Sequence, residues 1–313
     1  MILVTGATGF VGSALVNRLA HEKLPVRAVV RRAGYRPPPK VQCIQQGDMS
    51  FDTDWGAGLS GIHAVVHAAA RVHVMRDASA DPLQEFRKVN VTATLNLARQ
   101  AAHAGVQRFV YLSSIGVNGA QTDRRAFTAQ DEVAPHSPYA ISKYEAEVGL
   151  QALAVETGMQ VVIIRPPLVY GPGAAGNFGS LMRWLQRGLP LPLGAIHNQR
   201  SLVAIDNLVN LIVTCLTHLA AAGQTFLVSD GEDVSTTDLL RRLGQALGCP
   251  ARLIPVPASW LKLSAAMVGK TSVAQSLCGS LQVDIQKTRQ LLGWNPPLSL
   301  DQGLKKAAQG FAP

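Results

Sequence analysis

A tyrosine and a lysine placed four residues apart could move a proton. They are Tyr139 and Lys143, in the segment Pro138-Tyr139-Ala140-Ile141-Ser142-Lys143. On a helix this spacing puts both side chains on one face, one turn apart. We expect the lysine charge to lower the pKa of the phenol from its ordinary value of about 10. Tyr139 could then exchange a proton with an alcohol or ketone near neutral pH. An ordinary surface pair is the plain alternative.

Two serines end a predicted strand upstream of this pair. Ser113 and Ser114 close the run that begins at Phe109. Ligands of open parallel sheets bind at the carboxyl ends of the strands, so a hydroxyl here could hold the same substrate oxygen as Tyr139. Together with the glycine turn described next, serine, tyrosine and lysine in this order favour proton exchange at an alcohol or ketone over an ordinary surface pair.

A glycine-rich turn opens the chain, between a predicted strand over 2–5 and a predicted helix over 10–21. Its glycines permit a tight turn, a close approach of backbone to a pyrophosphate, and close packing of helix on strand. The N–H groups at the start of the helix favour an anion. The spacing G-x-x-G-x-x-G differs from the commonest fingerprint of dinucleotide-binding proteins. The turn predicts a dinucleotide site formed by Gly6, Thr8, Gly9, Phe10, Val11 and Gly12.

Basic residues follow the second predicted strand, where NAD-binding proteins carry an acid. Arg31 and Arg32 stand there, in a stretch from 27 to 40 with five basic residues and no acid. A guanidinium can bind a ribose 2′-phosphate, so NADP(H) is the preferred cofactor and NAD(H) the second choice. A solvated basic loop is the alternative. Asp48 and Met49 follow the third predicted strand, and Asp48 could accept a hydrogen bond from the adenine amino group.

Short apolar runs alternate with helical patterns through the first half of the chain. This rhythm predicts an α/β, doubly wound parallel sheet of the Rossmann type, with helices on both faces. The main segments are strands at 2–5, 26–30, 41–45, 64–68, 109–113 and 161–165, and helices at 10–21, 82–104 and 138–157. After residue 167 the rhythm breaks. Expected there are helices at 177–187, 206–221 and 236–247 and strands at 226–229 and 253–256.

This pattern predicts two domains. Residues 1–170 are expected to bind the dinucleotide, and residues 171–313 to form a smaller, mostly helical substrate domain. A segment near 200–230 is expected to return to the first domain.

Composition narrows the class of protein. The net charge of +9 fits an anionic partner, while 47% hydrophobic residues exclude a disordered chain. The sequence shows no membrane-spanning run, no secretion signal and no Cys-x-x-Cys pair. This predicts a cytoplasmic protein without membrane insertion. No basic stripe with interleaved aromatic residues indicates nucleic-acid binding. His63 and His67 flank one strand, about 13 Å apart, so no metal site is proposed.

The chain resembles the extended short-chain dehydrogenase/reductase superfamily. The glycine turn, the strand-end serines, the Tyr-x-x-x-Lys helix and the segment Gly293-Trp294-Asn295-Pro296 carry the resemblance. It is most similar to the sugar-nucleotide branch, which includes UDP-galactose 4-epimerases and UDP-N-acetyl-hexosamine 4-ketoreductases. The resemblance implies a cytoplasmic enzyme of polysaccharide biosynthesis that pairs as a homodimer through helices 82–104 and 138–157.

The resemblance also assigns roles to individual residues. Ser114, Tyr139 and Lys143 would be catalytic, and Tyr139 and Lys143 would also contact the cofactor. Further cofactor contacts would be Ala68, Ala69, Ala70, Pro166 and Val169. Substrate contacts would be Ser113, Ser114, Asn177 and Arg200, with Arg200 on the diphosphate. His73 lies in a segment expected beside the nicotinamide and could touch the sugar, or could belong to a partly buried loop.

Departures from the family pattern guide the functional hypotheses. The dehydratases carry an acidic pair where this chain has Ile115-Gly116, which disfavours loss of water. A second diphosphate arginine is not evident near residues 277–280.

Because Arg31 replaces the acid of many epimerases, the main hypothesis is NADPH-dependent reduction of the 4-keto group of a UDP-sugar, of the 4-keto-6-deoxy-N-acetyl-hexosamine type. The alternative is a UDP-hexose 4-epimerase with tightly bound NAD. A nucleotide-sensing regulator ranks third, since it would normally lack Tyr139 or Lys143.

Overall fold

The computed structural model describes residues 1–32, 34–72, 81–174, 176–267, 269 and 271–311. Its largest feature is a seven-stranded sheet in the order β3-β2-β1-β4-β5-β6-β9, in which every neighbouring pair is parallel. The strands are β1 (Ile2–Thr5), β2 (Val26–Val30), β3 (Gln42–Gln45), β4 (Ala64–His67), β5 (Arg108–Leu112), β6 (Gln160–Arg165) and β9 (Thr225–Leu227). The predicted fold class is confirmed.

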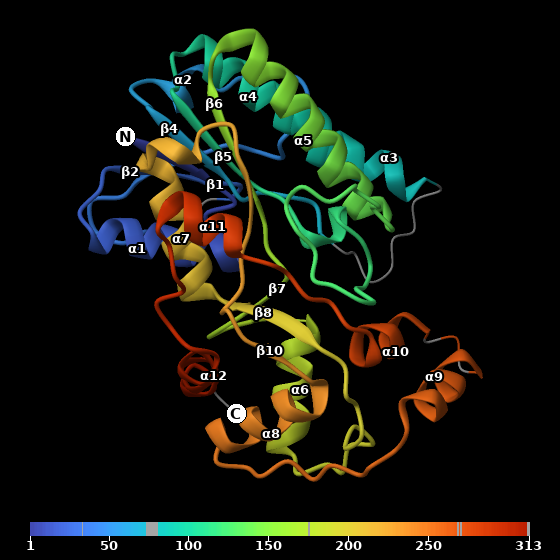
Figure 1. Ribbon diagram of the computed structural model, residues 1–313. Coiled ribbons are helices and arrows are strands. Elements are labelled where there is room, and N and C mark those ends of the chain that lie inside the picture. The colour runs from blue at the N-terminus through green and yellow to red at the C-terminus, as the bar shows by residue number, and fades with distance from the viewer. Residues whose placement is uncertain (33, 73–80, 175, 268, 270, 312–313) are drawn as a thin grey trace.

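Helices cover both faces of this sheet (Figure 1). One face is covered by α1 (Phe10–His21), α7 (Ile205–Thr217) and α11 (Gln286–Leu292). The other is covered by α4 (Thr94–His103), α5 (Pro138–Thr157) and the short α2 (Gly56–Leu59). Central strands such as β1 and β4 are buried along their whole length, because apolar residues point into both layers.

The long helix predicted over 82–104 is interrupted. It consists of α3 (Pro82–Arg87), a π-helical segment (Lys88–Ala93) and then α4. Asp81 caps its start, with Pro82 as the first helical residue. The π-helical segment contains the buried Asn90, and such segments are frequent at functional sites. The spacing of apolar residues in the sequence does not reveal the extra residue that makes a helical turn a π-helical one.

A second, smaller lobe lies beyond the carboxyl edge of the large sheet (Figure 1). Its sheet has the order β10-β8-β7, with β7 (Leu168–Tyr170), β8 (Arg200–Ala204) and β10 (Asp233–Val234). Around it lie α6 (Gly176–Gln186), α8 (Thr236–Ala246), α9 (Ala258–Met267), α10 (Thr271–Cys278) and α12 (Leu300–Gln309). None of these three strands was predicted, because they are short and lie among prolines and glycines.

The chain passes between the lobes more than once. β8 of the small sheet runs directly into α7, which packs against α1, and β9 then pairs with β6. The predicted helix over 206–221 ends at Thr217 and continues as a 3₁₀ turn. The predicted strand over 253–256 is wrong: Leu253 makes only an isolated bridge with Leu191. Among the helices that the structure describes, none is both long and apolar enough to cross a membrane.

Candidate active site

The glycine turn joins β1 to α1 at the carboxyl edge of the large sheet. Gly6 has a φ of +68°, and a Cβ there would lie 2.7 Å from the backbone nitrogen of Ala69. A Cβ on Gly12 would lie 2.0 Å from the Gly6 carbonyl oxygen, so α1 packs on the turn only with glycine at this position. Gly9, at the N-cap, has no side chain that could cap the helix, which leaves its first N–H groups free to bind an anion.

The remaining residues of the turn divide into exposed and packed side chains. Thr8 is exposed, whereas Phe10 and Val11 pack partly against the core under α1. The uncapped N–H groups at the start of α1 therefore fit a pyrophosphate group, and the exposed Thr8 lies in the same turn.

Arg31 and Asp48, which come from neighbouring strands, lie in contact. Their Nη1 and Oδ1 atoms are 3.3 Å apart, and both side chains are exposed. Arg32 beside them is exposed as well, whereas Met49 packs partly against the core. The structure thus supplies a carboxylate next to the end of β2, although no acid stands at that position in the sequence.

The segment after β4 borders the glycine turn. Ala68, Ala69 and Ala70 are half-buried, and the Ala69 N–H donates to Thr5 Oγ1 at 3.3 Å. His67 is fully buried, with its ring nitrogens 2.7 Å from Thr5 Oγ1 and 2.9 Å from Thr94 Oγ1. Burial, assisted by the nearby Lys143, lowers the pKa of His67 to about 3, so its imidazole is neutral.

The helix that carries the tyrosine and the lysine begins at Pro138 and ends at Thr157, as predicted. Ser137 Oγ accepts from the N–H of Ala140 at 3.2 Å, and Gly158 closes the helix with a φ of +74°. Tyr139 and Lys143 are therefore one turn apart on α5. The Lys143 ammonium lies 4.1 Å from the ring centre of Tyr111, on β5, which directs it onto the carboxyl edge of the sheet.

The pKa of Tyr139 moves in the direction opposite to the expected one. Burial raises it to about 12. Burial also lowers the pKa of Lys143 to about 7, opposed by the negative charge of Glu147. The prediction from spacing alone neglected the loss of water around both groups, which disfavours each charged form. Whether Lys143 carries its charge therefore depends on neighbouring groups such as Glu147.

The two serines have different surroundings. Ser114 caps a 3₁₀ turn (Ile115–Val117) and accepts from the Gly116 N–H at 3.1 Å. A Cβ on Gly116 would lie 3.4 Å from both Ser114 Oγ and Ala140 Cβ, so Ser114 lies beside the start of α5. Ser113 is buried and its hydroxyl donates to Glu147. Ser113 therefore contributes to the support beneath the site, and its contact with substrate stays a prediction.

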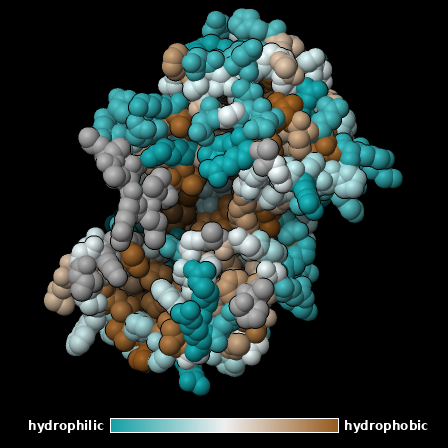
Figure 2. Space-filling model, turned by 180° about the vertical axis from the view of Figure 1, so that it is seen from behind, coloured by the Kyte–Doolittle hydropathy of each residue, from teal (hydrophilic) through white to brown (hydrophobic). Residues whose placement is uncertain are grey.

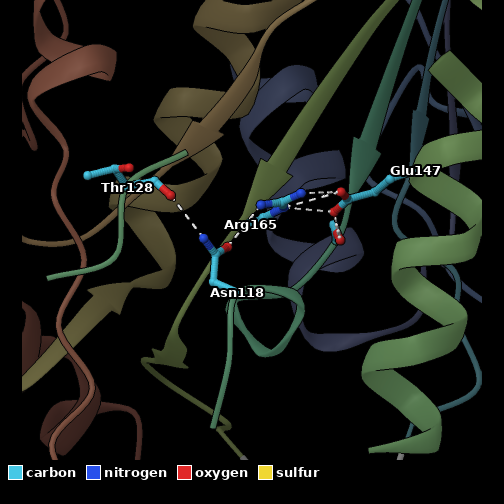
Figure 3. A network of polar contacts seen from close by, with 5 residues as sticks. Asn118, Thr128, Glu147 and Arg165 are labelled. Carbon is cyan, nitrogen blue, oxygen red and sulfur yellow. Dashed lines mark hydrogen bonds and ion pairs between the residues drawn. The ribbon is translucent and has the colours of Figure 1, made fainter. Parts of the chain in front are cut away.

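Figure 3 shows the buried network that supports this edge of the sheet. Arg165, the last residue of β6, forms an ion pair with Glu147 at 2.5 Å, with side-chain exposures of 6% and 1%. Arg165 Nη1 also donates to Asn118 Oδ1, and Asn118 donates to the Thr128 carbonyl oxygen. Glu147 lies one turn beyond Lys143 on α5, so the network fixes the charge nearest to the lysine. Sequence reasoning missed these residues.

Asn90 was missed as well. Its side chain accepts from the N–H of Arg71 at 2.8 Å and donates to the Arg71 carbonyl oxygen and to Ser142 Oγ, each at 3.0 Å. Ser142 precedes Lys143 on α5. The π-helical segment thereby ties the strand-end segment after β4 to the catalytic helix. An isolated asparagine in a helical pattern gives no signal of this role.

The predicted residues near the nicotinamide lie at the junction of the lobes. Pro166 is buried directly after β6, and its carbonyl oxygen accepts from the Ile115 N–H at 3.0 Å. Val169 is half-buried on β7. Figure 2 shows the surface hollowed between the two lobes, with hydrophobic residues in the hollow. His73 lies outside the described residues.

The two predicted substrate residues of the small lobe differ in exposure and in hydrogen bonding. Asn177 is exposed at the start of α6. Arg200 opens β8, and its guanidinium donates to the carbonyl oxygens of Ser276 and Gly279 at 2.7 and 3.2 Å. Arg200 is thus held by the end of α10 and by the segment 277–280, in which the expected second arginine is not evident. Burial lowers the pKa of Arg200. Within the part of the chain that is described, no cluster of His, Cys, Asp or Glu could hold a metal ion.

A doubly wound sheet, a glycine turn at its carboxyl edge and a Tyr–Lys helix beside a strand-end serine define a dinucleotide-binding enzyme of the short-chain dehydrogenase/reductase type. The model of the NAD dependent epimerase/dehydratase family matches residues 2–229. The chain belongs to this family, as an extended short-chain dehydrogenase/reductase.

Relatives and solved structures support the assignment over the whole chain. A UDP-glucose 4-epimerase of Vibrio cholerae is 48% identical, over 99% of this chain and 95% of its own length. A protein named MoeE5, solved with UDP-glucose and NAD, has a TM-score of 0.77 and 26% identity over 99% of this chain and 97% of its own. UDP-glucuronic acid 4-epimerase of Bacillus cereus, solved with NAD, shares the fold, with a TM-score of 0.80, 23% identity, and coverage of 99% and 97%.

Proposed function

We propose that the protein is an NAD-dependent 4-epimerase of a UDP-hexose. The observation that carries the proposal is the placement of Tyr139, Lys143 and Ser114 at one edge of the large sheet, in a chain 48% identical to a UDP-glucose 4-epimerase over nearly its full length. This gives more weight to the epimerase hypothesis than to the reductase hypothesis that Arg31 favours.

Each residue of the site has a chemical task in this proposal. Tyr139 takes the proton of the C4 hydroxyl and later returns it to the same oxygen. Ser114 holds that oxygen, and protonated Lys143 stabilises the phenolate. NAD, when bound, supplies the hydride acceptor that makes C4 a ketone. The carboxylate of Glu147 favours the charged form of Lys143, which the proton transfer requires.

Return of the hydrogen to the other face of C4 completes the epimerisation. The sugar must therefore turn while Tyr139 keeps its proton. The hollow between the lobes offers room for this turn, with the diphosphate held apart from the reacting ring (Figure 2). We assign the diphosphate to Arg200 and a sugar contact to Asn177.

The cofactor site fits NAD. The turn at Gly6 and Gly9 suits a pyrophosphate, because Gly9 has no side chain to cap α1 and the first N–H groups of the helix stay available to an anion. Asp48 lies beside the end of β2, in contact with Arg31, and can accept from a ribose hydroxyl or from adenine. The pairing also partly neutralises Arg31, which weakens the argument for a 2′-phosphate.

A second candidate is NADPH-dependent reduction of a 4-keto UDP-sugar. It is favoured by the two exposed arginines, Arg31 and Arg32, at the end of β2. The two functions differ in whether the cofactor is consumed. A reductase needs fresh NADPH in each turnover, whereas an epimerase regenerates its NAD.

We also propose how the domains and subunits are arranged. The dinucleotide domain comprises residues 1–170 together with α7 and β9, and the rest forms the substrate domain. The chain pairs as a homodimer through α4 and α5, since Val148 and Val155 are exposed on α5 at a spacing of two turns. Val148→Asp should then produce a monomer in analytical ultracentrifugation, while Leu219→Asp, at an exposed site elsewhere, should not.

The functional test uses protein purified without added cofactor. Heat-released nucleotide is identified, and the protein is mixed with UDP-galactose. The epimerase proposal predicts released NAD and formation of UDP-glucose. Empty protein that acts only on a 4-keto UDP-sugar with NADPH would support the second candidate and refute the first.

A further inference from the structure

Two stretches far apart in the sequence carry basic residues and no acids. Residues 157–205 and residues 239–283 contain no Asp or Glu and together hold nine of the 29 Lys and Arg residues.

The fold brings parts of these two segments together in the small lobe. α6 and the loop after it come from the first segment, and α9 and α10 from the second. Between them lies a cavity of about 560 Å³ with an almost wholly apolar lining, which includes Trp184, Leu189, Leu261, Val273 and Leu277.

α9 presents an apolar stripe to solvent beside the cavity. Trp260, Leu263 and Met267 are 72%, 65% and 75% exposed, and their spacing of three and four residues puts them on one face of the helix. Trp184, Leu189 and Val273 are exposed as well, at the mouth of the cavity. In Figure 2 hydrophobic residues gather on this part of the small lobe, at the lower left. Single exposed apolar residues are ordinary, but a continuous group indicates a contact surface.

Exposed basic residues border the stripe. Arg187 follows α6, Lys262 lies on α9, and Arg252 precedes α9 with its carbonyl oxygen bonded to the N–H of Leu191 in the cavity wall. None of the three forms an ion pair with an acid among the described residues. Arg242, by contrast, is already paired with Glu232, Asp238 and Asp301 and is not part of this border.

We propose that this face, formed by α9, the cavity mouth and Arg187, Arg252 and Lys262, binds the surface of an anionic phospholipid bilayer. α9 has ten residues and a length of about 15 Å, so it lies along the interface and does not span it. Trp260, Leu263 and Met267 enter the boundary between headgroups and acyl chains, where tryptophan is favoured. The basic residues bind lipid phosphates, as polybasic surfaces do.

The charge of the face argues for a bilayer over a second copy of this chain. A two-fold contact through the face would set Arg187, Arg252 and Lys262 close to the same residues of the second copy. That repulsion has no acid on the face to offset it, since both segments lack Asp and Glu. An anionic bilayer offers acyl chains to the apolar stripe and lipid phosphates to the basic residues beside it.

Vesicle flotation tests the proposal with the full chain. The intact protein should float with vesicles of equal parts phosphatidylglycerol and phosphatidylcholine, and remain behind with phosphatidylcholine alone. The triple variant Trp260→Ser, Leu263→Ser, Met267→Ser should lose at least about tenfold in affinity, since it removes the buried apolar area. Leu24→Ser with Leu219→Ser, at exposed sites far from the face, is the matched control and should bind as the intact protein does.

A second pair of variants tests the charges. Arg187→Gln with Lys262→Gln should weaken binding several-fold and reduce its salt dependence, while Lys305→Gln should not. Folding of every variant is checked by circular dichroism. Equal binding of the triple variant and the intact protein would overturn the proposal. So would flotation that does not depend on phosphatidylglycerol, or an intact protein whose self-association in ultracentrifugation is abolished by the triple variant.

Discussion

At the scale of single residues, the site depends on how burial and charge act together on α5. Tyr139 and Lys143 are the pair that the sequence indicates, yet burial disfavours the phenolate of one and the ammonium of the other. Glu147, held by Arg165 and Ser113, supplies the negative charge that favours charged Lys143. In the proposed reaction, the proton transfer at Tyr139 is thus prepared by residues that touch neither substrate nor cofactor.

Replacing Tyr139 by phenylalanine should remove the proton carrier and leave the packing in place. We expect kcat for UDP-galactose conversion to fall by about 10²–10⁴-fold, as for other general acid–base groups. Tyr144→Phe, on the same helix, is the control and should keep its activity. If Tyr139→Phe turned over at the rate of the intact protein, the assignment of Tyr139 would be wrong.

The lowered pKa of Lys143 makes stability depend on pH. In the folded protein its pKa is about 7, against an ordinary value of 10.5. Between these values the unfolded chain binds more protons, so the free energy of unfolding should rise with pH over this window. Lys143→Met should remove that part of the slope in urea unfolding between about pH 7 and pH 9. An unchanged slope would mean that Lys143 is not the titrating group.

The buried pair Glu147–Arg165 should be costly to break. Glu147→Gln leaves Arg165 buried without its counter-charge, and we expect a loss of about 3–5 kcal/mol in the free energy of unfolding. Glu145→Gln breaks the partly exposed pair with Arg87 on the same helix and should cost less than about 1 kcal/mol. Chemical denaturation of both variants measures the difference. Equal losses would show that burial of the pair does not matter.

At the scale of elements, the sequence predicted the strands and helices whose formation depends on local patterns of residues. The strands of the large sheet and the helices α1 and α5 were placed within one or two residues, because their apolar runs, caps and glycines are local signals. The strands β7, β8 and β10 were missed, because they are short and are held by partners far along the chain. The π-helical segment around Asn90 was missed as well, because the partners of Asn90, Arg71 and Ser142, lie 19 and 52 residues away along the chain.

The packing of α1 on the glycine turn should tolerate no side chain at Gly12. A Cβ there would meet the Gly6 carbonyl oxygen at 2.0 Å, so Gly12→Ala should lower the free energy of unfolding by about 1–3 kcal/mol and abolish retention of NAD. Gly47→Ala adds a Cβ with no atom within 4 Å and serves as the control. Thermal unfolding and the bound nucleotide are measured on both. NAD retained by Gly12→Ala would contradict the proposed pyrophosphate site.

At the scale of the whole molecule, two lobes divide the task between cofactor and sugar. The large sheet carries the glycine turn and Ser114 at its carboxyl edge, and the small lobe lies beyond that edge (Figure 1). The small lobe carries β7, Asn177 and Arg200. Which sugar fits cannot be predicted from motifs, because the small lobe is built from contacts between distant segments. The preference for NADP(H) was inferred from the basic stretch that holds Arg31 and Arg32, and the contact of Arg31 with Asp48, which follows β3, was not predicted.

In the proposed reaction the hydrogen at C4 leaves and returns to the same carbon within one active site. UDP-galactose with deuterium at C4 tests this claim in protein to which no cofactor is added. We predict UDP-glucose that retains the deuterium at C4, measured by mass spectrometry and proton NMR. Unconverted UDP-galactose, or UDP-glucose with protium at C4, would contradict it.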